Sequence, residues 1–332
     1  MRWCLAISLS LTLVVPTASA AEDRTQDILT AWNSWADQNV ITATAITIGY
    51  DGRILASEGR GRDPEAPYPL ASLTKAITAV CLKKVAEEQD LPLTTRLGDL
   101  TEQFAAAGVA LPTRVEDRPL SALITMSAGL KPDRTQRRFR QSASYGAESN
   151  VRFSNLALSW RGTLGKEGTY FYNNGSYALL GALLEGLTGT DNVSACRDRV
   201  FPEGHRGTPA FDDTWYGLGG FGGWQASTRD YTAFAMDAFN PEGDIATNLF
   251  DLPVYADSEG WHYGLGIKFR VIDGETVFFH RGAICRVAGE EQGAFFAYYG
   301  TGYAVTITYN TCGQGDVALS LDAAIFNAAQ PL

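Results

Sequence analysis

After its first twenty residues, the chain shows one apolar pattern typical of a helix and then two typical of strands. Apolar side chains in residues 27–38 recur at helical spacing, and residues 41–50 form a run rich in Thr and Ile. Asp51 and Gly52 supply a hairpin turn before a second strand pattern at 53–57. The chain is therefore expected to open as helix, strand, turn and strand.

Residues 71–87 carry the next helical pattern, and Ser72 stands at its start. The stripe expected to be buried is Ile77, Val80, Cys81 and Val85. From about residue 98 to 240 the pattern is mostly helix and loop, with glycine-rich breaks at 162–168 and 216–224. This middle stretch is expected to be a helical lobe.

Beyond residue 261 the pattern changes to short apolar or aromatic runs separated by Gly and Asp, as in an antiparallel meander. These runs cover residues 263–272, 276–280, 294–299 and 303–309. Residues 315–329 return to helical spacing. Strand patterns at both ends of the chain predict an α+β fold, in which an antiparallel sheet is flanked by N- and C-terminal helices and carries an inserted, mostly helical lobe.

The domain organisation follows from these patterns. Residues 21–332 are expected to form a single catalytic domain, which is within the size of one large core with an inserted lobe. Residues 21–97 and 255–332 would build the sheet part, and residues 98–254 the helical lobe.

The first twenty residues are typical of an export signal. Arg2 is their only charge, an apolar core runs from about Cys4 to Val15, and the small residues at 18–20 offer a cleavage site. The apolar run is too short for a stable membrane span. No Cys stands at the cleavage point to take a lipid anchor. We therefore expect a periplasmic or secreted protein, processed near Ala20, with no stable membrane anchor.

The charge balance bears on partners. A formal net charge of −10 argues against a nucleic-acid partner, because phosphate binding needs clustered Lys and Arg. One basic cluster does occur, at Lys131, Arg134, Arg137, Arg138 and Arg140. It is interpreted as a solvated loop or, alternatively, as a basic wall beside a cleft for an anionic substrate.

Four cysteines remain once the leader is set aside. An even number in an oxidising compartment favours disulfides. Cys285 and Cys312 flank the C-terminal strands and are the preferred pair. Cys81 lies on an apolar helix face, where a buried free thiol and a bond to Cys196 are equally plausible.

The candidate chemistry begins with the sequence Ser-Leu-Thr-Lys at residues 72–75. Ser72 and Lys75 are three residues apart on a helix and so share one face, where an amine can assist removal of the hydroxyl proton. None of the other lysines has a Ser three positions earlier, so the chain offers one such candidate. The helix N-terminus would also favour an anionic oxygen there.

Two further motifs follow in order along the chain. Tyr172 and Asn174 form its only Tyr-x-Asn, just ahead of an apolar helix pattern. All three histidines precede x-Gly, but His280 alone follows the glycine-rich blocks and ends a strand pattern. His280 is therefore the preferred candidate over His205 and His262, and the alternative is that it is a structural histidine. The order Ser-x-x-Lys, Tyr-x-Asn, His-x-Gly resembles the serine β-lactamase and penicillin-binding protein superfamily, in its class C-like branch of D-alanyl-D-alanine carboxypeptidases, D-aminopeptidases and esterases.

Other blocks extend this resemblance over most of the chain. Residues 123–130 are similar to that branch's Leu-Leu-x-His-x-Ser-Gly-Leu, residues 222–230 to its Gly-Gly-Leu-x-Ser-Thr-x-x-Asp, and residues 263–266 match its Tyr-Gly-Leu-Gly. The absence of Gly-x-Ser-x-Gly argues against an α/β-hydrolase. No metal-ligand set is evident, and the resemblance implies no cofactor.

The resemblance and the chemistry together imply roles. Ser72 would form an acyl-enzyme, with either Lys75 or Tyr172, at a depressed pKa, as the base. Asn174 would hold Lys75 and the substrate amide. The N–H groups of Ser72 and Ala283 would form the oxyanion hole.

The strand motif at residues 280–283 adds three expectations about the substrate. Gly282 would let the substrate backbone approach the strand. His280 replaces the Lys of many β-lactamases, so a fixed positive charge is expected to be missing at neutral pH. Arg281 could offer a bidentate fork to a substrate carboxylate, which favours peptides or lactams over neutral esters.

The expected function is that of an exported serine acyl hydrolase acting on D-Ala-type peptides or β-lactams, small-molecule or peptidoglycan-derived. Two alternatives stay open: a class C-like carboxylesterase, and a penicillin-binding sensor or cell-wall binding module with little turnover. The natural substrate and the oligomeric state are also left open by the sequence.

Overall fold

The computed structural model describes residues 18–135, 146–159, 164–211, 216–240, 243, 252, 260–272, 274–285 and 290–330. Nearly all of the expected export signal lies outside these ranges, as do Arg137, Arg138 and Arg140 of the basic cluster. None of the helices within these ranges has the length and apolar character needed to cross a lipid bilayer.

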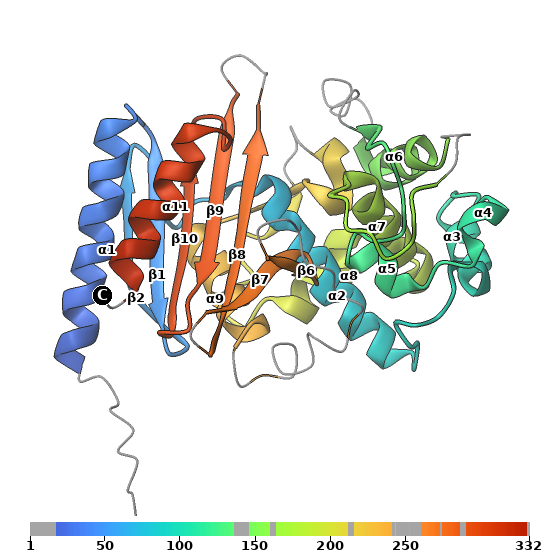
Figure 1. Ribbon diagram of the computed structural model, residues 1–332, viewed down its shortest axis with the longest axis horizontal. Coiled ribbons are helices and arrows are strands. Elements are labelled where there is room, and N and C mark those ends of the chain that lie inside the picture. Colours follow the sequence, from blue (N-terminus) through green and yellow to red (C-terminus); the bar gives the residue numbers. More distant parts are fainter. Residues whose placement is uncertain are drawn as a thin grey trace, which may run out of the picture.

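One antiparallel sheet organises the molecule (Figure 1). Its spatial order is β2-β1-β10-β9-β8-β7-β6, so β1 from the N-terminal part pairs with β10 from the C-terminal part. The strands are β1 (Thr44–Tyr50), β2 (Arg53–Arg60), β6 (His262–Gly264), β7 (Ile267–Ile272), β8 (Glu275–Ile284), β9 (Gln292–Tyr298) and β10 (Tyr303–Tyr309). The α+β class expected from the strand patterns at both ends of the chain is confirmed.

Helices cover both faces of the sheet (Figure 1). The helices are α1 (Ala18–Gln38), α2 (Thr74–Glu88), α3 (Thr101–Ala106), α4 (Thr113–Glu116), α5 (Leu120–Ile124), α6 (Ser149–Leu158), α7 (Asn174–Thr188), α8 (Asn192–Val200), α9 (Thr228–Ala238) and α11 (Asp316–Ala329). A small second sheet has the order β3-β5-β4, with β3 (Tyr68–Pro69), β4 (Ala210–Phe211) and β5 (Trp224–Ala226).

The terminal helices α1 and α11 pack together on one face of the large sheet. Trp32 and Trp35 of α1 are buried there in one apolar cluster with Val305 and Ile307 of β10. The indole N–H of Trp35 donates to the carbonyl of Val317 over 3.0 Å, which ties α1 to α11. Burial of two Trp side chains provides several kcal/mol of apolar stabilisation, of order 2–3 kcal/mol each.

The opposite face of the sheet carries α9 and then the helical lobe. Alternation along β10 turns Thr306 to this side, where it accepts a hydrogen bond from Thr232 of α9 over 2.7 Å. Although α9 falls within residues 98–254, it packs directly on β1 and β10. The described part of that range therefore combines lobe helices with a helix that belongs to the sheet layer.

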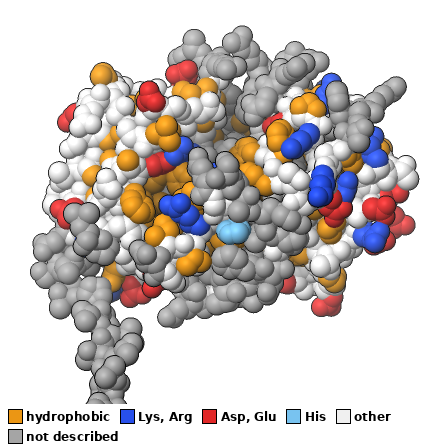
Figure 2. Space-filling view, viewed as in Figure 1, with side chains coloured by type: hydrophobic (Ala, Val, Ile, Leu, Met, Phe, Trp, Pro, Cys, Tyr) orange, Lys and Arg blue, Asp and Glu red, His pale blue; other side chains and the backbone are white. Residues whose placement is uncertain are grey.

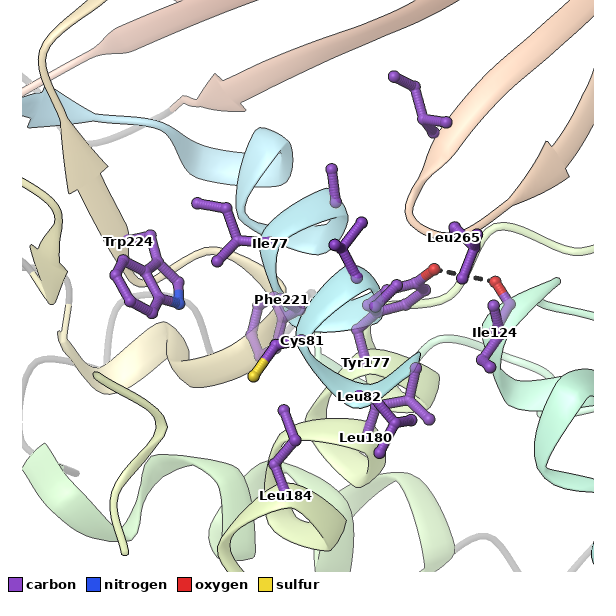
Figure 3. Packing of buried hydrophobic residues seen from close by; sticks show 14 of the residues in the cluster. Ile77, Cys81, Leu82, Ile124, Tyr177, Leu180, Leu184, Phe221, Trp224 and Leu265 are labelled. Atoms are coloured by element: carbon purple, nitrogen blue, oxygen red, sulfur yellow. Dashed lines mark hydrogen bonds between the residues drawn. The ribbon is translucent and has the colours of Figure 1, made fainter. Parts of the chain in front are cut away.

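Helix α2 runs through the centre of the molecule, where it contacts α7, α8 and the 3₁₀ segment η5 (Tyr216–Phe221). Figure 3 shows side chains of α7 and of η5 beside Ile77, Cys81 and Leu82. Residues 74–82 are buried on all sides, not along one stripe as the sequence pattern predicted. The reason is that the helix lies between two layers and has no solvent face over these turns.

Two disulfides join distant segments. Cys285 and Cys312 form the preferred pair and tie the end of β8 to the segment after β10. Cys81 is bonded to Cys196, which links α2 to α8, so the free-thiol alternative is wrong. Each bond restricts the unfolded chain and stabilises the fold by this means.

Candidate active site

Ser72 lies in a single 3₁₀ turn, η1 (Ala71–Leu73), immediately before α2. The preceding Ala71 has a left-handed φ of 47°, unusual for a residue with a side chain, which turns the chain sharply into this helix. The Nζ atom of Lys75 lies 3.0 Å from the Oγ atom of Ser72. The spacing seen in the sequence thus becomes a direct contact between amine and hydroxyl.

Lys75 is fully buried. Its Nζ atom also donates to the backbone carbonyl of Phe221 over 2.8 Å and lies 5.1 Å from the ring centre of Tyr172. Burial lowers the pKa of Lys75 to about 7, against the opposing effect of the Asp133 carboxylate. An amine with this pKa is substantially neutral near neutral pH and can accept a proton.

The Tyr-x-Asn motif is placed by the start of α7. The side chain of Asn173 caps this helix by accepting from the N–H of Ser176 over 3.0 Å, which holds Tyr172 just outside the helix and Asn174 in its first turn. Burial raises the pKa of Tyr172, although a hydrogen bond with Ser72 opposes this effect. The phenol is therefore neutral, which disfavours a phenolate base.

Asn174 is positioned differently from the expectation. Its backbone N–H donates to Asp133 over 3.2 Å, and its buried Oδ1 atom has no hydrogen-bond donor in the described part of the chain. The expected bond from Lys75 to this oxygen is not formed, because the described bonds of the amine go to Ser72 and Phe221. The oxygen remains available to a substrate N–H.

Strand β8 forms the opposite wall. It pairs with β7 only as far as Phe279, whereas its pairing with β9 continues to Ile284. Within the described residues, the edge from 280 to 284 has a strand neighbour on the β9 side alone. An extended substrate could add to the other edge.

Gly282 on this strand packs against the nucleophile segment. A Cβ atom there would lie 2.4 Å from the carbonyl oxygen of Leu70 and 3.1 Å from the Cβ atom of Ala71. The missing side chain thus lets β8 approach the turn that carries Ser72. This close approach between two protein segments is one reason for glycine at this position, and the expected approach of substrate stays a prediction.

His280 is buried and neutral. Its Nδ1 atom lies 2.8 Å from the carbonyl oxygen of Arg281, so Nδ1 carries the proton and Nε2 accepts from the Tyr263 hydroxyl over 3.2 Å. Burial and then the charge of Lys75 lower the pKa of His280 to about 3. The imidazole therefore supplies no positive charge at neutral pH, in agreement with the expected departure from the lysine of many β-lactamases.

Arg281 forms an ion pair with Asp322 of α11. Its guanidinium also lies 5.0 Å from the ring centre of Phe279, a residue of the core beneath α1 and α11. Alternation along β8 places Arg281 on the opposite face from His280. The expected free fork for a substrate carboxylate is therefore corrected: this guanidinium is already neutralised and stands at the rim of the site.

A cleft of 330 Å³ brings the predicted residues together. It is lined by Ser72, Tyr172, Asn174, Lys268, Phe279, His280, Arg281, Ala283, Gly313, Gln314 and Gly315. Lys75 and Gly282 are not among the lining residues: Lys75 is buried and contacts Ser72, and Gly282 packs against Leu70 and Ala71. Among the described residues, no three His, Cys, Asp or Glu side chains are grouped as metal ligands.

The other two histidines lie elsewhere. His205 faces the carboxylate of Asp230, with Nδ1 and Oδ1 3.0 Å apart, and His262 stacks on Phe269 with ring centres 5.5 Å apart. Neither lines the cleft.

Sequence reasoning missed three contributors to this site. Phe221 acts through its backbone carbonyl, which leaves no side-chain signal, and Asp133 lies in a loop without a motif. Tyr263 belongs to the Tyr-Gly-Leu-Gly block, and this block could have suggested it.

A buried polar network supports the η5 segment that receives Lys75. Asn150 accepts from the N–H of Gly220 over 2.8 Å and donates to Glu185 over 2.7 Å. Asn192 donates to the same Glu185 oxygen over 2.7 Å, while the Gly220 carbonyl accepts from Thr78 of α2 over 2.7 Å. Burial raises the pKa of Glu185 to about 7. The network thus joins α6, α7 and α8 to Gly220, the residue before Phe221, whose carbonyl accepts from Lys75.

Comparison with known proteins places this geometry in a family. A family model described as Beta-lactamase matches residues 32–330, so the chain belongs to the β-lactamase family. The fold is that of the serine β-lactamase and transpeptidase superfamily. A comparison with curated protein sequences found no match.

Solved structures show the same fold at low sequence identity. The octameric penicillin-binding protein homologue from Pyrococcus abyssi superposes with a TM-score of 0.71 at 17% identity, covering 92% of this chain and 78% of that one. A β-lactamase/D-alanine carboxypeptidase from Pseudomonas syringae gives 0.67 at 16% identity, covering 93% and 100%. The D-amino acid amidase from Ochrobactrum anthropi SV3 gives 0.68 at 15% identity, covering 92% and 98%.

Proposed function

We propose that this protein is a serine acyl hydrolase that forms an acyl-enzyme on Ser72. The observation that carries the proposal is the 3.0 Å contact between the Ser72 hydroxyl and the buried Lys75 amine at the floor of a cleft. A nucleophile and base within hydrogen-bond reach are the minimum that acyl transfer requires.

The proposed reaction has two halves. Neutral Lys75 accepts the hydroxyl proton of Ser72 while the Oγ atom of Ser72 bonds to the substrate carbonyl carbon. The Lys75 ammonium then gives that proton to the leaving nitrogen or oxygen as the bond between the leaving atom and the carbonyl carbon breaks. Water next attacks the acyl-Ser72 ester, releases the acid and restores the hydroxyl. The lowered pKa of Lys75 and the raised pKa of Tyr172 favour the amine as base.

Other cleft residues would orient the substrate. The N–H groups of Ser72 and Ala283 would bind the developing oxyanion, and the unpaired Oδ1 atom of Asn174 would accept from the substrate amide. The neutral phenol of Tyr172 would donate toward the Ser72 oxygen or the leaving group.

The proposed substrates are D-Ala-type peptides or β-lactams, small or derived from peptidoglycan. The named activities of the structural neighbours support an acyl substrate of this kind. A second candidate, esters or amides with no carboxylate beside the scissile bond, is supported by neutral His280 and by the pairing of Arg281 with Asp322.

The first test is covalent labelling by a fluorescent penicillin and a fluorescent phosphonate. Wild type should be labelled at Ser72, and Ser72→Ala should not; labelling that persists in Ser72→Ala would reject the proposal. Lys75→Ala should slow labelling by about 10²–10⁴-fold.

Turnover assays distinguish the candidate substrates from one another, and a hydrolase from a sensor with little turnover. Nitrocefin, a D-Ala-D-Ala peptide, a D-amino acid amide and a nitrophenyl ester form a sufficient panel. Mass spectrometry of the acylated protein over hours identifies a sensor by a persistent acyl mass and a hydrolase by its rapid loss.

We also propose export to the periplasm or the medium, with cleavage near Ala20. The leader pattern supports this, and two disulfides fit an oxidising compartment. The intact mass of the protein from a periplasmic extract tests it: an uncleaved cytoplasmic product would contradict the proposal.

A further inference from the structure

A second cavity of 420 Å³ lies between α11 and the face of β7, β8 and β9. Aromatic side chains form much of its lining: Trp261, Phe279, Phe295 and Phe326. Its volume is within the range of small-ligand pockets, about 300–1,000 Å³. Figure 2 shows basic and hydrophobic side chains exposed together on this face of the molecule.

Strand alternation explains the character of this groove. Lys268 and Arg270 on β7, and Phe279 and Arg281 on β8, point to the α11 side, whereas Phe269 and His280 point to the helical lobe. The cationic residues of both strands therefore gather in one place. Neither Lys268 nor Arg270 belongs to a sequence motif of the family.

The charge of the groove is positive although the chain carries a formal net charge of −10. Asp322 is the acidic residue in the lining, and it is paired with Arg281. Arg270 thus adds to the described lining a positive charge that Asp322 does not neutralise. Such a focused field in an acidic protein favours an anionic occupant.

Arg270 is held in a manner suited to binding an oxygen ligand. Its guanidinium stacks 4.4 Å from the ring centre of Trp261, which limits its motion. Its Nε atom is buried and has no hydrogen-bond acceptor within the described residues. Arg270 also lines the groove, where its guanidinium can form a charge-assisted hydrogen bond to a carboxylate.

The groove is continuous with the catalytic cleft. Lys268, Phe279 and Arg281 line both cavities. Lys268 and Phe279 form the last pair between β7 and β8. The free edge of β8 begins just beyond this pair. A substrate longer than the cleft can therefore pass over Lys268 into the groove.

We infer that the groove is a distal subsite for an extended acyl substrate, in which Arg270 binds a carboxylate remote from the scissile bond and the aromatic residues hold the apolar part of the chain. This rests on the proposed function and assigns the anionic recognition to β7 instead of His280 and Arg281. The substrate class is accordingly an acidic peptide or peptide-like amide.

The test compares three synthetic D-Ala-D-Ala peptides: a short acetylated one, a long one ending in a distal carboxylate, and the same long one with the carboxylate converted to an amide. For Arg270→Gln, KM for the long carboxylate peptide should rise about tenfold, as expected for loss of a charge-assisted bond, with kcat and both other peptides unchanged. Arg53→Gln, an exposed residue on β2 at the other end of the sheet, is the matched control and should change nothing.

A second variant guards against indirect effects of removing a stacked arginine. Ala323 is an exposed lining residue of α11, and Ala323→Trp would fill the groove without burying a new group in the core. It should raise KM for both long peptides and leave KM for the short acetylated peptide unchanged. Equal changes for all three peptides, or none, would overturn the subsite.

Labelling of Ser72 separates this inference from the proposed function. If Ser72 is labelled normally but KM is the same for the long peptides with a distal carboxylate and with a distal amide, the subsite alone is rejected. Loss of labelling in wild type rejects both.

Discussion

The amine of Lys75 donates a hydrogen bond to the backbone carbonyl of Phe221 over 2.8 Å, across 146 positions of sequence. This contact joins the helix that carries the nucleophile to η5, a segment held from the other side by Asn150. The base is therefore oriented by the helical lobe, while its serine is packed against the sheet.

The pH dependence of acylation should report Lys75. Its pKa is lowered to about 7, so the amine is protonated and unable to accept a proton below that pH. We expect the second-order rate constant of acylation by the lactam to fall about tenfold for each pH unit below 7 and to level off above pH 7. A nitrocefin or fluorescent penicillin assay between pH 5 and 9 measures this.

Two variants control that experiment. Asp133→Asn removes a carboxylate that raises the pKa of Lys75, so the acid limb should move to lower pH. His280→Gln should leave the limb in place, because the pKa of His280, about 3, lies below the measured range. A rate independent of pH from 5 to 8 would contradict the role of Lys75.

Asn150 should position the catalytic amine without touching substrate. Asn150→Ala leaves the buried N–H of Gly220 without its acceptor, which should cost about 1–3 kcal/mol in the free energy of unfolding and lower the acylation rate with little change in KM. Ser154→Ala on the same buried face of α6 is the control, since its hydroxyl makes no described hydrogen bond. Equal effects of both changes on acylation would argue against a positioning role.

Gly266 should be required for the placement of Lys75. It has a φ of 80°, and a Cβ atom there would lie 2.2 Å from the backbone carbonyl of Lys75. Gly266→Ala should therefore destabilise the fold and abolish labelling of Ser72. Gly260→Ala, at a φ of 79° with open space around it, isolates the conformational cost of about 1–2 kcal/mol and should be labelled normally. Denaturant unfolding and labelling of both variants provide the comparison.

The two disulfides should contribute unequally to stability. Cys81–Cys196 closes a separation of 115 residues and Cys285–Cys312 one of 27. Chain-entropy arguments give losses of about 5 and about 3.5 kcal/mol when each pair is replaced by Ala. Urea unfolding of the two double variants checks the order; a larger loss for Cys285–Cys312 would show that native contacts, not loop length, dominate.

The sequence by itself determined the features that depend on short spacing. Ser72 and Lys75 meet because residues three apart on a helix share a face, and the strand patterns at both ends of the chain predicted one sheet because alternation and turn residues are local signals. The order of the motifs was enough to indicate the family.

Only the tertiary structure decided the charges and partners. The neutral state of His280, the lowered pKa of Lys75 and the pairing of Arg281 with Asp322 arise from burial and from residues distant in sequence. Desolvation and long-range contacts depend on how layers pack, and no local spacing encodes them. For the same reason the groove beside α11, built from strands and a helix that meet only in the folded chain, had no sequence signal.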